Sequence, residues 1–89
     1  MEHRGGQGSG ALDTLLHEQL VSLRDNEARR LDIPKYVIFM DSSLEDMATL
    51  YPMTMEDMAN VSGVSMGKAQ RFAQPFLDLI KDYVEEYEN

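Results

Sequence analysis

One segment of the sequence, Gly63-Val-Ser-Met-Gly67-Lys68-Ala69, approaches a phosphate-binding motif. A loop of the G-x-x-x-x-G-K-[ST] type holds phosphates with backbone N–H groups and a lysine, and it holds magnesium with a hydroxyl. Here the glycines are one residue too close, Ala69 replaces the hydroxyl, and the segment follows a predicted helix instead of a strand. We therefore do not expect a nucleotide-binding site at this turn.

The other polar residues do not suggest catalysis or metal binding. The chain has two histidines, His3 and His17, and no cysteine, so a zinc site is not expected. The acidic pairs at 45–46 and 56–57 fall in predicted first helical turns, where the helix dipole favours carboxylates. We predict that the chain itself is not an enzyme and holds no cofactor.

Charge is distributed unevenly along the chain. The formal net charge is -8, and five acids occur between residues 37 and 60 without a base. Bases gather instead near the end of the first predicted helix and beside the glycine turn. A negative net charge opposes nonspecific attraction to nucleic acid or to an anionic membrane. A contact with phosphates would therefore depend on a local cluster of bases.

Hydrophobic spacing predicts helices as the elements that position these bases. Leucines recur at helical intervals and indicate one long amphipathic helix that ends before Pro34. Pro75 is expected either to divide the last helical stretch or to kink it. The predicted elements are a flexible Gly/Ser-rich linker over 1–10, one helical domain over 11–89, and helices over 11–31, 43–51, 55–61, 66–73 and 75–87.

Residues 32–41 interrupt the helical period with the apolar run Tyr-Val-Ile-Phe-Met. The run is rich in strand-forming residues, but the sequence offers no second strand to pair with it. We expect an irregular or 3₁₀ segment that fills the core. Val37 or Ile38 should be buried together with Phe39, and Tyr36 should lie nearer the surface.

Capping signals mark where three helices should begin. Ser42 with Glu45 matches a capping box, and Thr54 with Asp57 matches a variant of it. Ser65 can cap the final helix. The glycine turn should therefore lie directly between two helices.

Three motifs follow one another in a characteristic order. Residues 33–41 read Ile-Pro-x-Tyr-Val-Ile-Phe-x-Asp, residues 52–58 read Pro-x-Thr-x-Glu-Asp-Met, and residues 61–68 read Val-x-Gly-Val-x-x-x-Lys. Over about residues 12–84 the chain resembles the HRDC domain, the helicase-and-RNase-D C-terminal module, and most of all that of bacterial RecQ-type DNA helicases. The family usually has a second glycine where Ser65 stands.

The resemblance implies an all-α, compact five-helix bundle that acts as an auxiliary nucleic-acid-binding module. Its partners would be single-stranded or branched DNA and the motor domain of the same polypeptide, which would use ATP and magnesium in DNA repair and recombination. We expect a monomer in the cytoplasm, associated with the nucleoid and not with a membrane. A parent of the RNase D type, acting on RNA, shares the fold and is an alternative.

Two surfaces compete as the binding surface of such a module. In one hypothesis bases neutralise phosphates and Tyr36 stacks on a nucleobase. In the other, the acidic residues of the two helices near 45 and 56 dock on a basic protein or on the motor domain. The arginines could equally be solvated charges, and Tyr36 could be half-buried core. The candidate nucleic-acid-binding residues are Arg24, Arg29, Arg30, Lys35, Tyr36, Lys68 and Arg71.

Overall fold

A computed structural model describes residues 11–88 of the chain and folds them into helices, with no strand in that range. The all-α prediction is thus confirmed, while the linker predicted over 1–10 lies outside the described residues. The helices are α1 (Thr14–Leu31), α2 (Lys35–Ile38), α3 (Asp41–Leu50), α4 (Met55–Ala59) and α5 (Met66–Glu88).

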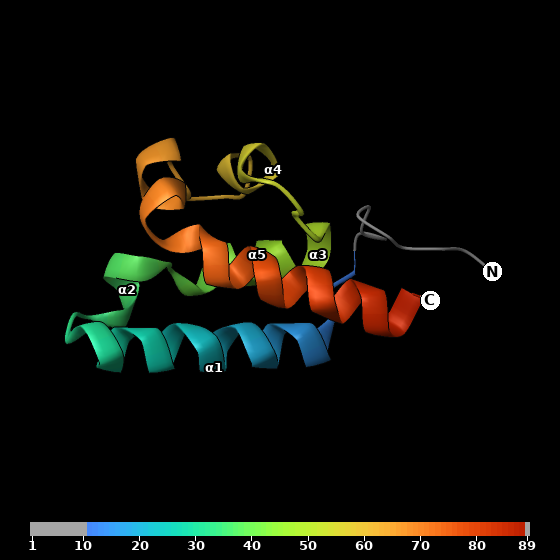
Figure 1. The fold of residues 1–89 in the computed structure, drawn as a ribbon, viewed down its shortest axis with the longest axis horizontal. Helices are drawn as coiled ribbons and strands as arrows, with labels where there is room; N and C mark the ends of the chain where they lie inside the picture. Colours follow the sequence, from blue (N-terminus) through green and yellow to red (C-terminus); the bar gives the residue numbers. More distant parts are fainter. Residues whose placement is uncertain (1–10, 89) are drawn as a thin grey trace.

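The helices place the two ends of the described chain at one end of the molecule (Figure 1). Helix α1 contacts α2, α3 and α5, and α4 contacts α5. Figure 1 shows the second half of α5 running alongside α1, so that α1 begins where α5 ends. The last turn of α1, the short α2 and the first turns of α5 lie together at the opposite end.

The core is built where α1, α3 and α5 face one another. Leu16 and Leu20 of α1 are fully buried, as are Phe39 and Phe76. The two phenylalanine rings meet edge to face with their centres 4.9 Å apart, an arrangement that aromatic rings favour. Burying each large apolar side chain stabilises the fold by about 1.5–3 kcal/mol. The ring contact fixes α5 against the residue that follows α2.

Helix α2 corrects the expectation of an irregular or 3₁₀ segment. It is a single α-helical turn that begins after Pro34 and closes when Phe39 donates its N–H to the Lys35 carbonyl, at 3.3 Å. Phe39 then turns to an extended backbone and enters the core. Ile38 and Phe39 are fully buried and Tyr36 is exposed, as predicted. Sequence spacing cannot separate one α turn from a 3₁₀ turn, because the two differ by one residue in the hydrogen bond.

Helix α5 is continuous through Pro75, which selects the kinked alternative over two separate helices. Proline has no N–H to donate to the carbonyl of residue 71, and its ring crowds that turn. Figure 1 shows the helix bending between its orange and red parts. The bundle therefore has five helices because α2 is one of them and α5 is a single helix. The bend carries the first turns of α5 away from the axis of its second half.

Two of the predicted caps are confirmed. The hydroxyl of Thr54 accepts the Asp57 N–H at 3.0 Å, and the Asp57 carboxylate accepts the Met53 N–H at 3.1 Å. The hydroxyl of Ser65 accepts the Lys68 N–H at 3.1 Å. Each cap satisfies N–H groups that a helix leaves open at its start.

The capping box predicted at Ser42 and Glu45 is wrong. Helix α3 begins earlier, at Asp41, and its N-cap is Met40, which provides no side-chain acceptor. The Asp41 carboxylate lies instead 2.7 Å from the guanidinium of Arg24. Helix α3 thus begins at a residue that forms an ion pair with α1. Spacing within the segment cannot reveal such a pair.

The start of α1 is anchored by a cap that the sequence analysis did not identify. The Asp13 carboxylate accepts the Leu16 N–H at 3.1 Å and the hydroxyls of Tyr51 and Tyr83, each at 2.7 Å. These two tyrosines lie at the end of α3 and in α5. Burial, followed by the hydrogen bond to Asp13, raises the pKa of Tyr83 well above its ordinary value. One carboxylate thus joins the beginning of α1 to two other helices.

The turn before α5 uses the glycine that the sequence singled out. Gly63 has φ +76°, a left-handed backbone conformation that favours glycine. A Cβ atom placed on it would meet the Ser43 hydroxyl at 3.0 Å. That hydroxyl donates to the Ser62 carbonyl at 2.6 Å. The turn is therefore held against α3 by a contact that leaves no room for a side chain.

Candidate nucleic-acid interface

Six of the seven predicted residues come from elements that meet at one end of the molecule. They belong to the last turn of α1, to α2 and to the first turns of α5, which lie together in Figure 1. We call this region the basic end and define it by Arg29, Arg30, Lys35, Tyr36, Lys68 and Arg71.

Arg24 is the exception, because its side chain is buried. The guanidinium donates to the Phe39 carbonyl at 3.1 Å, to Asp41 at 2.7 Å and to Asp25 at 3.0 Å. Burial alone would lower the pKa of Arg24, but the hydrogen bonds that it donates to these carboxylates outweigh burial and raise that pKa. The hydrogen bond between Arg24 and Asp41 also lowers the pKa of Asp41. Arg24 thus joins α1 to the residues around α2 and does not face solvent.

Tyr36 is the aromatic residue of the basic end, and half of its surface is exposed. The guanidinium carbon of Arg24 lies 5.5 Å from the centre of its ring, and the Lys35 Nζ lies 5.4 Å from it. Both distances fall within the range of cation–π attraction. The ring is therefore supported by a buried cation and keeps exposed surface on which a nucleobase could stack.

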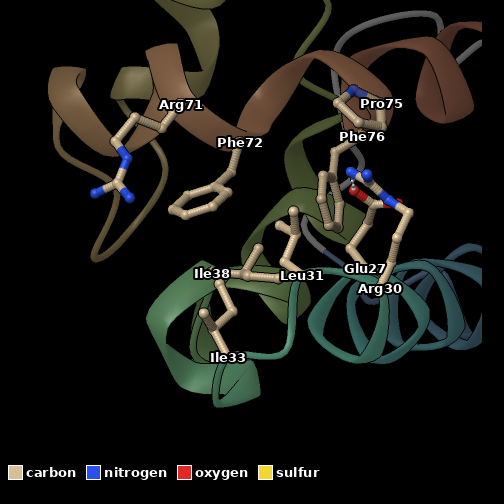
Figure 2. Close-up of a pocket in the computed structure, with 9 residues that line it drawn as sticks. All are labelled: Glu27, Arg30, Leu31, Ile33, Ile38, Arg71, Phe72, Pro75 and Phe76. Carbon is tan, nitrogen blue, oxygen red and sulfur yellow. Dashed lines mark hydrogen bonds and ion pairs between the residues drawn. The ribbon is translucent and has the colours of Figure 1, made fainter.

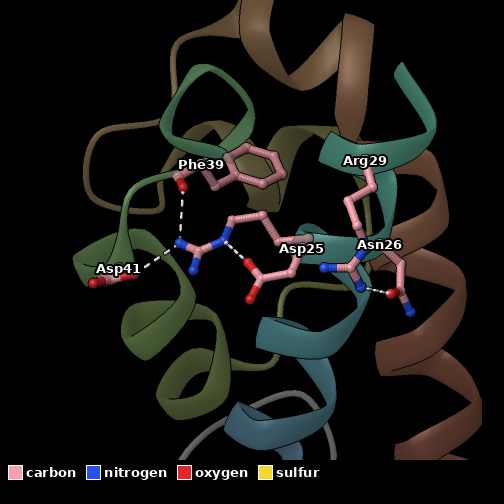
Figure 3. A network of polar contacts seen from close by, with 6 residues as sticks. Asp25, Asn26, Arg29, Phe39 and Asp41 are labelled. Carbon is pink, nitrogen blue, oxygen red and sulfur yellow. Dashed lines mark hydrogen bonds and ion pairs between the residues drawn. The ribbon is translucent and has the colours of Figure 1, made fainter. Parts of the chain in front are cut away.

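Two arginines of α1 carry local partners. Arg30 makes a paired hydrogen bond to Glu27 at 3.1 and 2.7 Å, and Arg29 donates to Asn26 (Figure 3). The hydrogen bond from Arg30 lowers the pKa of Glu27. The side chain of Arg30 is 65% exposed, and exposed pairs of this kind are weak and screened by salt. Arg30 can therefore exchange Glu27 for a phosphate at little cost.

A pocket of about 580 Å³ lies between the end of α1 and the first half of α5. Figure 2 shows Arg71 on one side of it and the Arg30–Glu27 pair on the other. The Arg71 guanidinium carbon lies 4.9 Å from the centre of the Phe72 ring. The pocket is lined by Glu27, Arg30, Leu31, Ile33, Ile38, Arg71, Phe72, Pro75 and Phe76.

Three bases of the basic end, unlike Arg29 and Arg30, have no hydrogen-bonding or ion-pair partner for their side chains among residues 11–88. Within residues 11–88, no ion pair joins Lys35, Lys68 or Arg71 to a carboxylate. Lys68 lies one helical turn before Arg71 on α5 and is partly exposed. These three cations, drawn from two helices, are available for an anionic ligand.

The sequence analysis assigned Phe72 to the apolar face of the last helix and missed its place in the pocket. Phe72 is only partly buried and packs against the rim of the core. A signal was present in the sequence, since Arg71 and Phe72 stand four and three residues before the proline that bends α5. The bend sets this part of the helix at an angle to the second half of α5 (Figure 1), and linear spacing does not show that angle.

The acidic side chains favoured by the competing hypothesis lie elsewhere. Glu45 and Asp46 of α3 line a shallow hollow with Leu12 and Ser62. Asp46 also accepts the Ser62 N–H at 2.8 Å.

In the part of the chain that the structure describes, no cluster of three or more acidic or histidine side chains could hold a metal ion, and no helix is both long and apolar enough to cross a bilayer.

Comparison with known proteins adds to this geometry. The profile of the HRDC domain family matches residues 13–80. The chain is 38% identical over 71 residues to the ATP-dependent DNA helicase RecQ of Pasteurella multocida, covering 80% of this chain and 11% of the relative. It is 36% identical over 77 residues to RecQ of Haemophilus influenzae, covering 86% and 12%.

A mammalian protein is similar to the same extent. The chain is 39% identical over 70 residues to the mouse bifunctional 3'-5' exonuclease/ATP-dependent helicase WRN, covering 79% of this chain and 5% of the relative. The chain spans about a tenth or less of the length of these relatives.

Proposed function

The chain belongs to the HRDC domain family, and from this premise we propose that it binds single-stranded or branched DNA weakly through the basic end. The relatives that carry similar segments are named ATP-dependent DNA helicases. We propose that the chain serves such a helicase as an auxiliary module that has no catalytic role. ATP and magnesium would then be used by a motor domain, and the module would adjust how that motor engages DNA.

The observation that supports DNA binding is the convergence of bases from three helices. The five cations of the basic end can each replace a counterion of the phosphate backbone. The exposed ring of Tyr36 adds a surface for stacking that does not depend on base identity. Bases and an aromatic ring on one face are the expected features of a site for single strands.

The charge of the remaining surface supports a weak and oriented interaction. The whole chain has a net charge of -8, and acids on α3, α4 and the second half of α5 would repel a phosphate backbone. The basic end, where five cations lie near Glu27 and Asp32, offers the most favourable approach. We therefore expect binding that is measurable at low salt and lost as salt rises.

Fluorescence anisotropy with a labelled oligo-dT strand tests this proposal. If all five cations contact phosphates, affinity should fall roughly 100-fold between ~50 and ~200 mM salt, since each single-strand phosphate contributes about -0.7 to the slope. Removing two of the cations with Lys68→Ala and Arg71→Ala should weaken binding and flatten that slope. Lys81→Ala, which removes a base from the second half of α5, is the matched control and should change neither.

A second candidate function is docking of the acidic face on a basic protein or on the motor domain of the same polypeptide. The hollow in which Glu45 and Asp46 adjoin the exposed Leu12 favours it, because it combines charge with an apolar contact. Absence of DNA binding at low salt would reject the first function and favour this one. An oligo-rU strand in the same assay distinguishes a module that prefers RNA.

A further inference from the structure

We propose that the pocket between α1 and α5 receives one unstacked nucleobase, with Arg71 holding the adjoining phosphate. This inference rests on the proposed function and adds a specific site to it. The pocket is separate from the ring of Tyr36, which is not among its lining residues. A bound strand would therefore have two places to stack a base, the Tyr36 ring and the pocket.

The shape of the pocket suits a flat apolar group. Its floor is made by Ile38 and Phe76, which are fully buried, and its walls by Leu31 and Phe72, which keep exposed surface. A volume of about 580 Å³ lies within the range of sites that enclose small ligands. A base entering it would cover apolar surface that is otherwise exposed to water.

The charges at the rim indicate what should accompany that flat group. Arg71 is exposed, has no ion pair within residues 11–88, and adjoins the Phe72 ring at 4.9 Å. A nucleotide carries an anionic phosphate next to a flat ring, so its phosphate and its base could meet Arg71 and Phe72 together. Arg30 adds a second guanidinium across the pocket, where it already compensates the Glu27 carboxylate (Figure 2). The rim thus favours an anionic ligand.

The position of the pocket favours a nucleic acid strand as the source of that ligand. Lys68 lies one turn before Arg71 on α5, and Ile33 leads from the pocket wall into α2, where Lys35 and Tyr36 lie. A strand with one nucleobase in the pocket would place its neighbouring phosphates toward these lysines. An apolar peptide would cover the same walls but would leave the exposed Arg71 guanidinium without an anionic partner.

The test compares an oligo-dT strand with a matched strand in which abasic sites replace the central thymines. Affinities are measured by anisotropy in the Tyr36→Leu background, so that stacking on Tyr36 does not contribute. We expect the thymine strand to bind roughly fivefold or more tightly than the abasic strand. Adding Phe72→Leu should bring that ratio to about one, since leucine fills similar space but offers no ring. Tyr87→Leu, at the far end of α5, should leave the ratio unchanged.

A second measurement uses the unaltered protein and does not depend on how Phe72→Leu folds. In ¹H–¹⁵N spectra, the amide signals of Leu31, Ile33 and Phe72 should shift with the thymine strand and much less with the abasic strand. Equal shifts with both strands would overturn the inference, as would equal affinities in the Tyr36→Leu background.

The outcomes separate this inference from the function on which it rests. If both strands bind equally and with strong salt dependence, the basic end binds DNA but the pocket does not take a base. If neither strand binds at low salt, the proposed function fails and the inference fails with it. Shifts at the pocket caused by an acidic, apolar peptide and by neither strand would assign the pocket to a protein partner and overturn the inference.

Discussion

The guanidinium carbon of Arg24 lies 5.5 Å from the centre of the Tyr36 ring, so a buried cation of α1 supports an exposed ring of α2. The same guanidinium holds the Phe39 carbonyl and the Asp41 carboxylate. Arg24 therefore holds the residues that follow α2 and also supports the ring of Tyr36, which is proposed to stack on DNA.

Replacing Arg24 should destabilise the fold more than replacing any exposed base. Arg24→Met leaves the Phe39 carbonyl without its donor, and we expect a loss of about 2–4 kcal/mol in the free energy of unfolding. Urea unfolding followed by circular dichroism measures it. Arg29→Met removes an exposed arginine of the same helix and should change stability by less than about 0.5 kcal/mol. Equal losses in the two variants would contradict the structural role of Arg24.

Gly63 before α5 and Gly67 in its first turn should respond to alanine in opposite directions. Gly63→Ala places a Cβ at a positive φ and 3.0 Å from the Ser43 hydroxyl, so we expect a loss of about 1–3 kcal/mol. Gly67→Ala lies in the first turn of α5 with nothing within 4 Å of the new atom. It should stabilise the helix by about 0.5–1 kcal/mol. Thermal unfolding of both variants measures the difference, and similar effects would contradict the geometry of the turn.

Stability should fall in alkaline solution partly because of Tyr83. Its pKa in the folded protein is raised above the unfolded value of about 10, because of burial and the hydrogen bond to Asp13. The contribution is therefore fully present below pH ~10 and is lost as pH rises toward the folded pKa. Urea unfolding of the parent protein and of Tyr83→Phe, at neutral pH and above pH ~10, measures it. The variant should lose less stability over that interval, and an equal loss would exclude Tyr83 as a source.

Tyr36 and Lys35 should affect DNA binding in different ways although they are adjacent. Tyr36→Leu removes stacking and should weaken oligo-dT binding roughly 5- to 100-fold, with the dependence on salt unchanged. Lys35→Ala removes one phosphate contact and should change the slope of log affinity against log salt by about 0.7. Anisotropy titrations over a series of salt concentrations measure both quantities. If Tyr36→Leu flattened the slope as Lys35→Ala does, stacking would not be its role.

Patterns within a segment predicted most of the fold, and contacts between segments account for what they missed. The caps at Thr54 and Ser65 and the turn at Gly63 depend on residues three or four positions apart, which spacing shows directly. Arg24 follows Leu16 and Leu20 at intervals of four residues and shares their face of α1. The sequence therefore contained an indication that Arg24 is buried. Its acceptors at Phe39 and Asp41 are 15 and 17 residues away, and no local pattern links them to it.

The candidate site was predicted in composition but not in geometry. Helical periodicity could place Arg29 and Arg71 on their own helices, but the relation between those helices depends on how α5 bends at Pro75. The pocket beside Phe72 arises from that bend together with the packing of α1. Both are properties of the assembled chain, which explains why the sequence could not distinguish a core phenylalanine from one that lines a surface pocket.

Helix α1 begins, and α5 ends, at the end of the molecule opposite the basic end (Figure 1). The 18 residues of α1 span about 27 Å at 1.5 Å per residue. The basic end thus lies at the tip of an arm whose other end carries both termini of the described chain. A modest rotation of the whole domain about that other end would carry Tyr36 and Arg71 along a wide arc. The domain could then reach strands at different positions without changing its own shape.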